Sequence, residues 1–237
     1  MPLTDALISD GYAVIPDVLA AEAVTSLTEA LERGAPGGAA LRRGSAVYGA
    51  RNLLRDVPAV RALAESVAVR SLVEPVLGAE AFAVRALLFD KTPSANWPVA
   101  WHQDRTIAVR EKRDVPGFGP WTVKAGVPHV QPSLAILENM LTVRLHLDKC
   151  DETNGPLQVI PGSHRDGYLD SEAIRSCTAE AHPVCCLVPR GGALLMRPLL
   201  LHCSARATRP RHRRVIHLEF AAGPLPGELE WFEQERT

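Results

Sequence analysis

The sequence predicts a mainly β fold: a double-stranded β-helix, or jelly roll, with a cupin-like core and flanking helices. Two observations lead to this prediction. Apolar residues recur at helical spacing in most of the first 80 residues, whereas the part from 81 to 222 contains short apolar runs separated by Gly, Pro, Asn and Asp. Helices followed by many short strands are typical of a two-sheet roll that helices cover on one side.

The N-terminal part is predicted to supply a strand and the covering helices. We expect a strand at 11–16, a helix at 18–34, a loop at 35–50 and two short helices within 57–78. Gly34 suits the position just after a helix, because glycine adopts the left-handed conformation found there. Pro75 and Gly78 indicate where the last helix stops. These helices are expected to pack on the outside of a sheet.

The β-rich part is predicted to form the core of the roll. Its strand-like runs are 81–90, 141–148, 157–164, 182–189, 193–205 and 214–222. One long interruption, about 105–140, separates the first two runs, and a connection of this length inside a compact domain is usually functional. We therefore interpret it as a lid within a single domain, 1–237, made of the N-terminal part (1–80) and the roll (81–222).

Composition and charge narrow the class of protein. The chain has 237 residues, of which 46% are hydrophobic, with 26 Lys and Arg against 27 Asp and Glu. A net charge of −1 gives no electrostatic reason to expect nucleic acid as a partner. No leader-like segment or long uncharged apolar run occurs, so we expect a cytoplasmic protein without a membrane partner. The sequence carries no signal of oligomeric state.

The cysteines indicate neither a disulfide framework nor a zinc knuckle. They are odd in number and form no C-x-x-C pair: Cys150, Cys177, Cys185, Cys186 and Cys203. Reduced thiols are therefore expected. A nucleophilic role for Cys203 beside His202 is disfavoured, because adjacent residues of a strand point to opposite faces.

The motif WHQD, residues 101–104, places a histidine and an aspartate two positions apart. In an extended segment His102 and Asp104 project from the same face while Gln103 points elsewhere. Both could therefore touch one metal ion. An H-x-D pair is common in ordinary polar loops, so a third ligand has to be found.

Of the eight histidines, His202 is the best candidate for that ligand. It ends the apolar run MRPLLLH and shares a strand face with Ser204, and a polar group at the mouth of an apolar barrel is where ligand sites form. The six remaining histidines have simpler explanations, either a position in a turn, a loop or the lid, or ordinary hydrogen bonding within a strand. They are His129, His146, His164, His182, His212 and His217.

Two imidazoles and one carboxylate on one face of an octahedron leave three positions open, as in non-heme Fe(II) oxygenases. Structural zinc would instead use four protein ligands. An open site that holds a chelating co-substrate also needs a cation for the co-substrate's distant carboxylate. The basic turn offers Arg206, Arg209, Arg211, Arg213 and Arg214. The first three of these are better explained as a solvated turn.

Three segments together resemble the phytanoyl-CoA dioxygenase family of Fe(II)/2-oxoglutarate-dependent oxygenases. They are WHQD, NGPLQVIPGSHRDG (154–167) and LLLHCSARATRPRHRRVIHLEF (199–220). The resemblance covers about 81–222 and includes a similar opening, GYAVIPDVL. It implies that Fe(II) is held by His102, Asp104 and His202. It also implies that 2-oxoglutarate and O₂ are consumed while a small molecule is hydroxylated and succinate and CO₂ are released.

The same resemblance implies that Arg213 and Ser204 bind the far carboxylate of 2-oxoglutarate, and that Gln103 approaches the co-substrate. Arg214 is an alternative to Arg213. It is in phase with the apolar residues of 214–222, so if that apolar face lies beneath the helices Arg213 faces inward. A β-bulge would exchange the two arginines.

The candidate substrate residues are Arg105, Trp121, Lys124 and His129 in the predicted lid and Arg144 on the strand 141–148. They would suit a small polar or carboxylated substrate. The polar face that carries Arg144 could equally be an exposed face. Two other functions stay open at this point: a catalytically silent binder of metal or small ligands, and a cupin-type metalloenzyme that does not use 2-oxoglutarate. Desaturation and ring formation are alternatives to hydroxylation.

Overall fold

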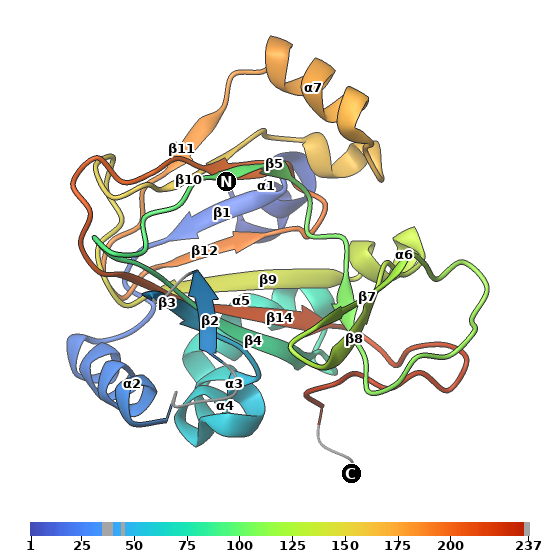
Figure 1. Cartoon of the computed structure of the whole chain (residues 1–237), viewed down its shortest axis with the longest axis horizontal. Coiled ribbons are helices and arrows are strands. Elements are labelled where there is room, and N and C mark those ends of the chain that lie inside the picture. The colour runs from blue at the N-terminus through green and yellow to red at the C-terminus, as the bar shows by residue number, and fades with distance from the viewer. Residues whose placement is uncertain (35–39, 44–45, 235–237) are drawn as a thin grey trace.

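A computed structural model describes residues 1–34, 40–43 and 46–234. Its largest element is a seven-stranded antiparallel sheet with the order β1-β12-β9-β14-β4-β3-β2 (Figure 1). These strands are β1 (Tyr12–Ile15), β2 (Ala40–Arg43), β3 (Ala46–Ala50), β4 (Phe82–Lys91), β9 (Met140–His146), β12 (Ala193–Met196) and β14 (Arg213–Ala221).

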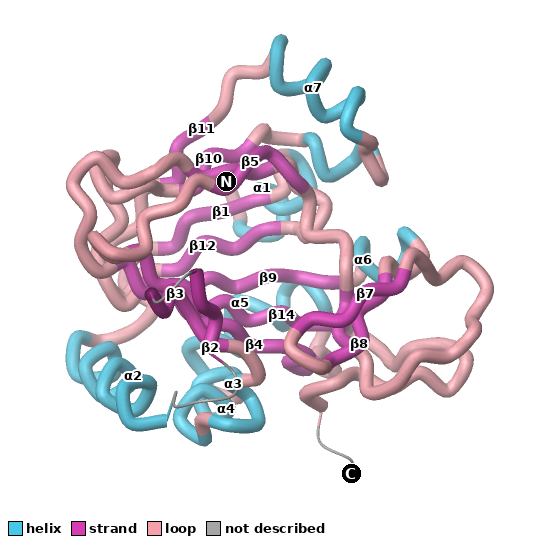
Figure 2. The backbone as a smooth tube through the Cα atoms, in the orientation of Figure 1, coloured by secondary structure: helices cyan, strands magenta, loops and turns pink. Residues whose placement is uncertain are grey.

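A second, four-stranded sheet faces the first one and has the order β11-β10-β13-β5. Its strands are β5 (Val99–His102), β10 (Leu157–Val159), β11 (Val184–Cys186) and β13 (His202–Ser204). Figure 2 shows the two sheets as successive layers of strands, with helices outside the larger sheet. This arrangement confirms the predicted jelly roll with flanking helices.

The helices cover the outer face of the larger sheet. They are α1 (Leu3–Ser9), α2 (Ala21–Gly34), α3 (Leu53–Asp56), α4 (Pro58–Ala64) and α5 (Val67–Leu77). Alternate residues of β14, among them Ile216, Leu218 and Phe220, form one buried cluster with helix residues such as Leu63 and Val73. The apolar phase of the strand therefore lies beneath the helices, and the opposite phase is left for the space between the sheets.

Local composition misled the prediction at the start of the chain. The segment 35–50 was expected to be a loop, but β2 and β3 lie within it, while 35–39 and 44–45 are outside the described residues. Ala50 of β3 pairs with Leu88 of β4, so long-range pairing at the sheet edge outweighs the weak local strand signal. Helix α1, before the first strand, was not predicted.

Two helix and strand boundaries also differ from expectation. Pro75 lies inside α5, which continues to Leu77, so the helix stops at Gly78 and not at the proline. The run 193–205 was expected to be one strand but forms β12 and β13, which belong to different sheets. The chain changes sheet at the intervening Arg197–Leu201, where Leu200 N donates to Arg197 O in a turn.

A further helix, α7 (Ser171–Glu180), was also missed by the prediction. It buries none of its residues and projects from the top of the molecule in Figure 1. The carboxylate of Asp170 caps its first turn by accepting from the backbone N–H groups of Glu172 and Ala173. A short 3₁₀ helix, Ser163–Asp166, precedes it.

The segment 105–140, which was predicted to be a lid and keeps that name below, forms ordered secondary structure at one end of the roll. It contains a three-stranded sheet, β6-β8-β7, and one short helix. These elements are β6 (Ile107–Ala108), β7 (Trp121–Lys124), β8 (Val127–Val130) and α6 (Leu134–Glu138). Val109 and Val130 of the lid share a buried cluster with Leu229 and Trp231 of the C-terminal segment. Packing of this kind restricts the lid far more than a solvated loop would be restricted.

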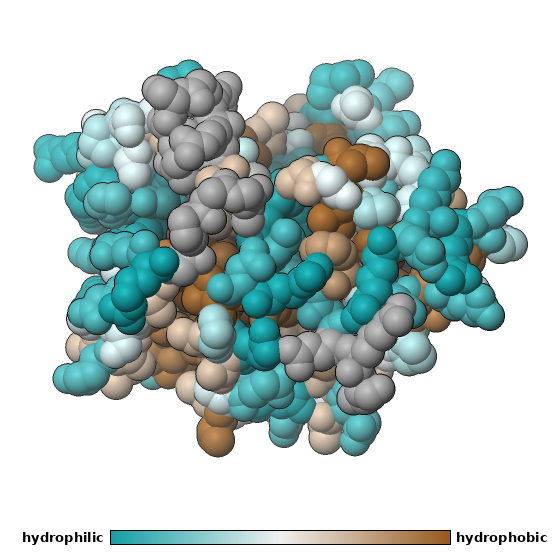
Figure 3. All heavy atoms as spheres, turned by 60° about the horizontal axis from the view of Figure 1, so that its bottom comes forward, coloured by the Kyte–Doolittle hydropathy of each residue, from teal (hydrophilic) through white to brown (hydrophobic). Residues whose placement is uncertain are grey.

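The surface is mainly hydrophilic on the face that Figure 3 shows, where hydrophobic residues form small scattered groups. Among the described helices, none has the length and apolar character needed to cross a membrane. All five cysteines are free thiols, as predicted.

Candidate metal centre and active site

His102, Asp104 and His202 converge in the space between the two sheets. His102 and His202 are direct cross-strand partners on β5 and β13. The two Nε2 atoms lie 3.8 Å and 3.7 Å from the two carboxylate oxygens of Asp104. One potential ligand atom from each of the three residues lies within 4.8 Å of the other two. Two strands and the loop after β5 therefore bring three distant donors together.

Backbone carbonyl groups fix the orientation of both imidazole rings. The Nδ1 atom of His102 lies 2.8 Å from the oxygen of Ala100, and that of His202 lies 2.9 Å from the oxygen of Leu200. Because a carbonyl can only accept, Nδ1 carries the hydrogen in each ring and a neutral ring keeps its lone pair on Nε2. Both lone pairs are then directed to the side of Asp104, as metal ligands require.

The protonation states also suit a cation. Burial, opposed by the nearby Asp104, lowers the pKa of His202 to about 4, so its imidazole is neutral at physiological pH. Burial alone would raise the pKa of Asp104, but His202 and His217 outweigh it and hold that pKa below its usual range. A neutral imidazole and an ionised carboxylate are the states in which these groups bind metal. No fourth His, Cys, Asp or Glu joins the group among the described residues.

A cavity of about 210 Å³ adjoins the three donors and is lined from both sheets and the lid. Pockets for drug-sized ligands measure roughly 300–1,000 Å³, so this one suits small molecules. Alternate residues of β4 and β14 form its floor, because the other phase is buried under the helices. Arg213 lies opposite Lys91 at one end of this floor, and Glu219 lies opposite Arg85 at the other.

The first end of the cavity is built around Arg213 and Lys91. The Arg213 side chain is 4% exposed and donates through Nη1 to the oxygen of Gly155, while its Nε has no partner among the described residues. Lys91 is fully buried and donates to Ser204 Oγ at 3.0 Å and to Ala205 O at 2.5 Å. Burial and the charge of Arg213 lower the pKa of Lys91 to about 7.

Arg214 points away from this cavity to the helix side of the sheet. Its Nε and Nη2 atoms each lie 2.9 Å from a carboxylate oxygen of Asp148, and its Nη1 lies 3.3 Å from Glu32. The register shift on β14 falls between Glu219 and Phe220, beyond the arginines. The strand phase is therefore regular at this point, and Arg213 is the one that faces inward.

A chain of polar contacts crosses the middle of the cavity floor. Arg144, on β9, donates through Nη1 to His217 Nδ1 at 2.7 Å, and His217 Nε2 donates to Glu219 Oε1 at 3.2 Å. Glu219 also accepts from Arg85 Nη1 at 3.0 Å. Burial and the charge of Arg213 lower the pKa of Arg144 to about 10, so it stays charged at physiological pH. Arg144 thus lines the interior and is not exposed.

The remaining predicted site residues divide into two groups. Lys124 and Arg144 line the cavity. Gln103 does not: its Nε2 donates to Gly167 O and Leu199 O at 2.8 Å each, and its Oε1 accepts from Leu169 N. Its polar atoms are occupied in holding the 167–169 loop.

Three predicted substrate residues of the lid also lie outside the cavity lining. Arg105 donates to Leu169 O at 3.0 Å. Trp121 packs against the lid cluster, with Lys112 over its ring at 5.9 Å. His129 is 2% exposed and bonds through Nδ1 to Val127 O at 2.9 Å.

Several cavity residues were missed by the sequence reasoning. They are Arg51, Arg85, Lys91, Thr106, His217 and Glu219. Strand alternation could have found Arg85 and Lys91, which share the phase of Leu87 and Phe89, and it could have found His217 and Glu219, which share the phase of Arg213. Arg51, just after β3, carried no such signal, because that strand itself was not predicted.

Known structures share this fold. EctD from S. alaskensis, solved with 2-oxoglutarate and 5-hydroxyectoine, is 20% identical, with 98% of this chain and 82% of that one covered at a TM-score of 0.74. AviO1 from Streptomyces viridochromogenes Tue57 is 22% identical over 94% and 96%, with a TM-score of 0.68. The epimerase SnoN, in complex with Fe³⁺, alpha ketoglutarate and nogalamycin RO, is 19% identical over 95% and 90%, with a TM-score of 0.68.

Comparison with curated proteins gave no match. The model of the phytanoyl-CoA dioxygenase (PhyH) family, in contrast, matches residues 8–215, which include the three candidate ligands, Ser204 and Arg213. Most of the sequence is therefore accounted for by one family, in agreement with the jelly roll and the resemblance of its three motifs. The chain belongs to the phytanoyl-CoA dioxygenase family.

Proposed function

We propose that this protein is an Fe(II)/2-oxoglutarate-dependent dioxygenase that hydroxylates a small molecule. The observation that carries the proposal is the convergence of His102, Asp104 and His202 with no fourth protein donor in the group, within the part of the chain described. Such a donor set leaves coordination positions for a chelating co-substrate and O₂. Family membership and the iron and 2-oxoglutarate in the neighbouring structures support the same conclusion.

The co-substrate's far carboxylate would bind at the end of the cavity that holds Arg213, Lys91 and Ser204. Arg213 is charged throughout the physiological range and offers a fork of donors that matches a carboxylate. Lys91 adds a second cation, and it already contacts the Ser204 hydroxyl at 3.0 Å. Ser204 lies two residues from His202 on β13, so the anchor and the metal ligand share one strand face. Gln103 has no part in this proposal.

Iron, when bound with 2-oxoglutarate and O₂, would supply the oxidising chemistry that converts a C–H bond to C–OH while succinate and CO₂ are released. The chain's own residues position and isolate the reactants. The Ala100 and Leu200 carbonyls hold the two imidazoles in the metal-binding tautomer. The buried wall residues exclude water and fix the co-substrate at a single end of the cavity.

Anaerobic calorimetry with Fe(II) followed by 2-oxoglutarate tests the binding step, and succinate release across a panel of small metabolites tests turnover. His202→Ala should weaken metal binding by at least about a hundredfold, since it removes one of three donors. His182→Ala is the matched control, because that histidine lies on the surface away from the donors. Undiminished substrate-coupled succinate formation by His202→Ala would overturn the proposal.

Two other outcomes would point to other functions. Tight 2-oxoglutarate binding without turnover on any substrate of the panel would indicate a silent binding protein. Metal-dependent activity that neither consumes 2-oxoglutarate nor responds to Arg213→Met would indicate a metalloenzyme of another class on the same roll.

A further inference from the structure

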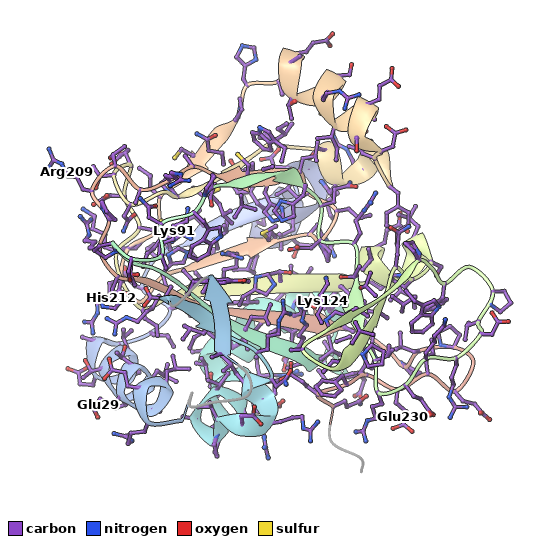
Figure 4. The ribbon with its side chains drawn as sticks, in the orientation of Figure 1. Glu29, Lys91, Lys124, Arg209, His212 and Glu230 are labelled. Atoms are coloured by element: carbon purple, nitrogen blue, oxygen red, sulfur yellow. The ribbon has the colours of Figure 1, made fainter. Side chains whose placement is uncertain are left out.

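A second group of cations lines the cavity at the end opposite Arg213. Arg51 follows β3, Arg85 lies on β4 and Lys124 ends β7, and all three line the cavity. We call them the distal cation group. Figure 4 shows Lys91 and Lys124 toward opposite ends of the space between the sheets. The proposed binding of 2-oxoglutarate uses only the Lys91 end.

The register of the sheet separates the two ends. Arg213 pairs with Lys91 and Glu219 pairs with Arg85, six residues farther along both strands. At about 3.4 Å per residue, the two pairs lie roughly 20 Å apart. A five-carbon diacid anchored at Arg213 cannot also reach Arg85. The distal cation group is therefore free for a different molecule.

The metal triad lies between these two ends. On its own sheet, His202 is two residues from Ser204, which contacts Lys91. Asp104 is electrostatically coupled to His217 on β14 of the facing sheet. His217 lies two residues from Glu219 and four from Arg213 along that strand. Thr106, two residues after Asp104, accepts a hydrogen bond from Lys124 Nζ at 3.1 Å. A molecule held by the distal cation group would thus lie beside the triad.

Positive charge is in excess at this end. Among the described residues, Arg85 is the only one of the three cations with an acidic partner, Glu219, and that carboxylate also accepts from His217. Lys124 has a hydroxyl partner, and Arg51 Nη1 is buried with no hydrogen-bond partner in the described parts of the chain. A buried donor without an acceptor, such as Arg51 Nη1, costs free energy, and an anionic ligand that accepts from it would remove this cost.

The other acid that acts on Arg51, Glu233, does not balance these charges. Glu233 accepts from Leu54 N at 2.9 Å and Ala86 N at 3.0 Å, and it is not part of the cavity wall. Burial raises the pKa of Glu233 to about 7, which reduces its negative charge further. Burial, with Arg85 and Arg51 as further causes, lowers the pKa of Lys124, and the opposing charges of Asp104 and Glu219 do not offset this shift.

We propose that Arg51, Arg85 and Lys124 bind the anionic group, a carboxylate or a phosphate, of the primary substrate. The substrate is then a small organic anion whose carbon skeleton extends from the distal cation group toward His102, Asp104 and His202. The size of the cavity, about 210 Å³, limits how large this skeleton can be. This inference rests on the proposed function, because it assigns the opposite end to 2-oxoglutarate.

Calorimetry on protein loaded anaerobically with Fe(II) and saturating 2-oxoglutarate tests the inference without turnover. Benzoate and phenyl phosphate serve as anionic probes, and benzamide and phenol are their uncharged counterparts. Each anion should bind at least about tenfold more tightly than its counterpart, because charge-assisted hydrogen bonds are roughly twice as strong as neutral ones. Preference for benzoate would indicate a carboxylate substrate, and preference for phenyl phosphate a phosphorylated one.

Two variants probe the distal cation group directly. Arg51→Gln and Lys124→Gln should each weaken the preferred anion by about tenfold or more and leave the affinity for its uncharged counterpart unchanged. Lys112→Gln is the matched control, since it makes the same change on the exposed side of the lid. Arg85 is left intact, because its removal would leave Glu219 buried without its partner.

The affinity for 2-oxoglutarate distinguishes a failure of the proposed function from a failure of the distal anion site alone. Both variants should bind 2-oxoglutarate as the unaltered protein does, which also shows that they are folded. Failure of the unaltered protein to bind 2-oxoglutarate would contradict the proposed function itself. Normal 2-oxoglutarate binding, together with equal affinities for the anionic and uncharged probes, would overturn only the distal anion site. Weakened 2-oxoglutarate binding in Arg51→Gln or Lys124→Gln would overturn it too.

Discussion

Arg213 and Lys91 lie directly opposite each other on β14 and β4, both buried, and neither side chain forms an ion pair among the described residues. Two like charges in this position disfavour each other and the folded state. Their hydrogen-bond acceptors include two backbone carbonyls and the Ser204 hydroxyl, and Lys91 Nζ also lies 5.7 Å from the centre of the Trp97 ring. In the proposed function, this pair would bind the far carboxylate of 2-oxoglutarate.

Replacing Lys91 with methionine should make the ligand-free protein more stable and the co-substrate site weaker. The variant removes a buried cation that has no acidic partner among the described residues and replaces it with an apolar side chain of similar volume, so the free energy of unfolding should increase. It also removes one cation from the carboxylate, so 2-oxoglutarate affinity should fall by about tenfold or more. Urea denaturation without ligands and anaerobic calorimetry measure the two effects. A loss of stability with unchanged affinity would contradict this account.

The same lysine should make 2-oxoglutarate binding depend on pH. Burial and Arg213 lower the pKa of Lys91 to about 7, so it loses its charge as pH rises above that value. Affinity should then decrease by up to about tenfold per pH unit above 7, because binding must restore the proton. Lys91→Met should show a flatter profile between pH 7 and 9. A profile identical in both proteins would assign the dependence to another group.

Ligand-free stability should respond to pH in the opposite direction. Between about 7 and the ordinary lysine pKa of 10.5, the unfolded chain binds a proton at Lys91 that the folded chain does not. The free energy of unfolding attributable to this group therefore increases with pH across that window. Urea midpoints of the unaltered protein and of Lys91→Met, compared at pH 7 and pH 9, measure this contribution. Equal changes in both proteins would show that Lys91 makes none.

Arg213 and Arg214 form a matched pair of test positions, since they are adjacent and face opposite sides of the sheet. Arg213→Met should weaken 2-oxoglutarate by about a hundredfold, because it removes the permanently charged anchor. Arg214→Met breaks the contacts to Asp148, so it should lower stability and leave 2-oxoglutarate affinity unchanged. Calorimetry and denaturation curves of both variants measure the difference. Reversed effects would mean that the strand phase is shifted by one residue in solution.

Strand alternation explains why the convergence of the three candidate ligands and the inward direction of Arg213 could be predicted in large part. His102 and Asp104 share a face because they are two residues apart, and Arg213 differs from Arg214 because the apolar phase of β14 is recognisable from Ile216, Leu218 and Phe220. These are local properties of one strand or loop. The family resemblance then joined the local pieces into one site.

The distal cation group shows what local patterns cannot supply. Arg51 reaches the cavity only because β3 pairs with β4, and β3 lies in a segment whose composition indicated a loop. Lys124 belongs to a lid whose docking depends on residues about a hundred positions later in the chain. The split of 193–205 into two sheets also depends on partners far away in sequence. Long-range pairing, which a single sequence does not encode in its periodicity, decides these features.

Trp231 should control the order of the lid without forming part of the metal centre. Its side chain is 2% exposed, it pairs with Val109, and its Nε1 donates to Gly223 O at 3.2 Å. Replacing a buried tryptophan with alanine lowers the free energy of unfolding by about 3–5 kcal/mol, because it leaves a void. Here that void would form beneath β6 and β8. Trp231→Ala should therefore speed amide hydrogen exchange at 107–109 and 127–130, while β9 and β14 keep most of their protection.

Val123→Ala is the matched control for this experiment, because Val123 lies on β7 of the same lid with 71% of its surface exposed. It should leave hydrogen exchange unchanged. Metal affinity should be similar in both variants, since β5, the loop that follows it and β13 position His102, Asp104 and His202. Binding of an anionic probe at Lys124 should weaken in Trp231→Ala. Uniform loss of protection throughout the chain would instead show that the lid and the roll unfold as one unit.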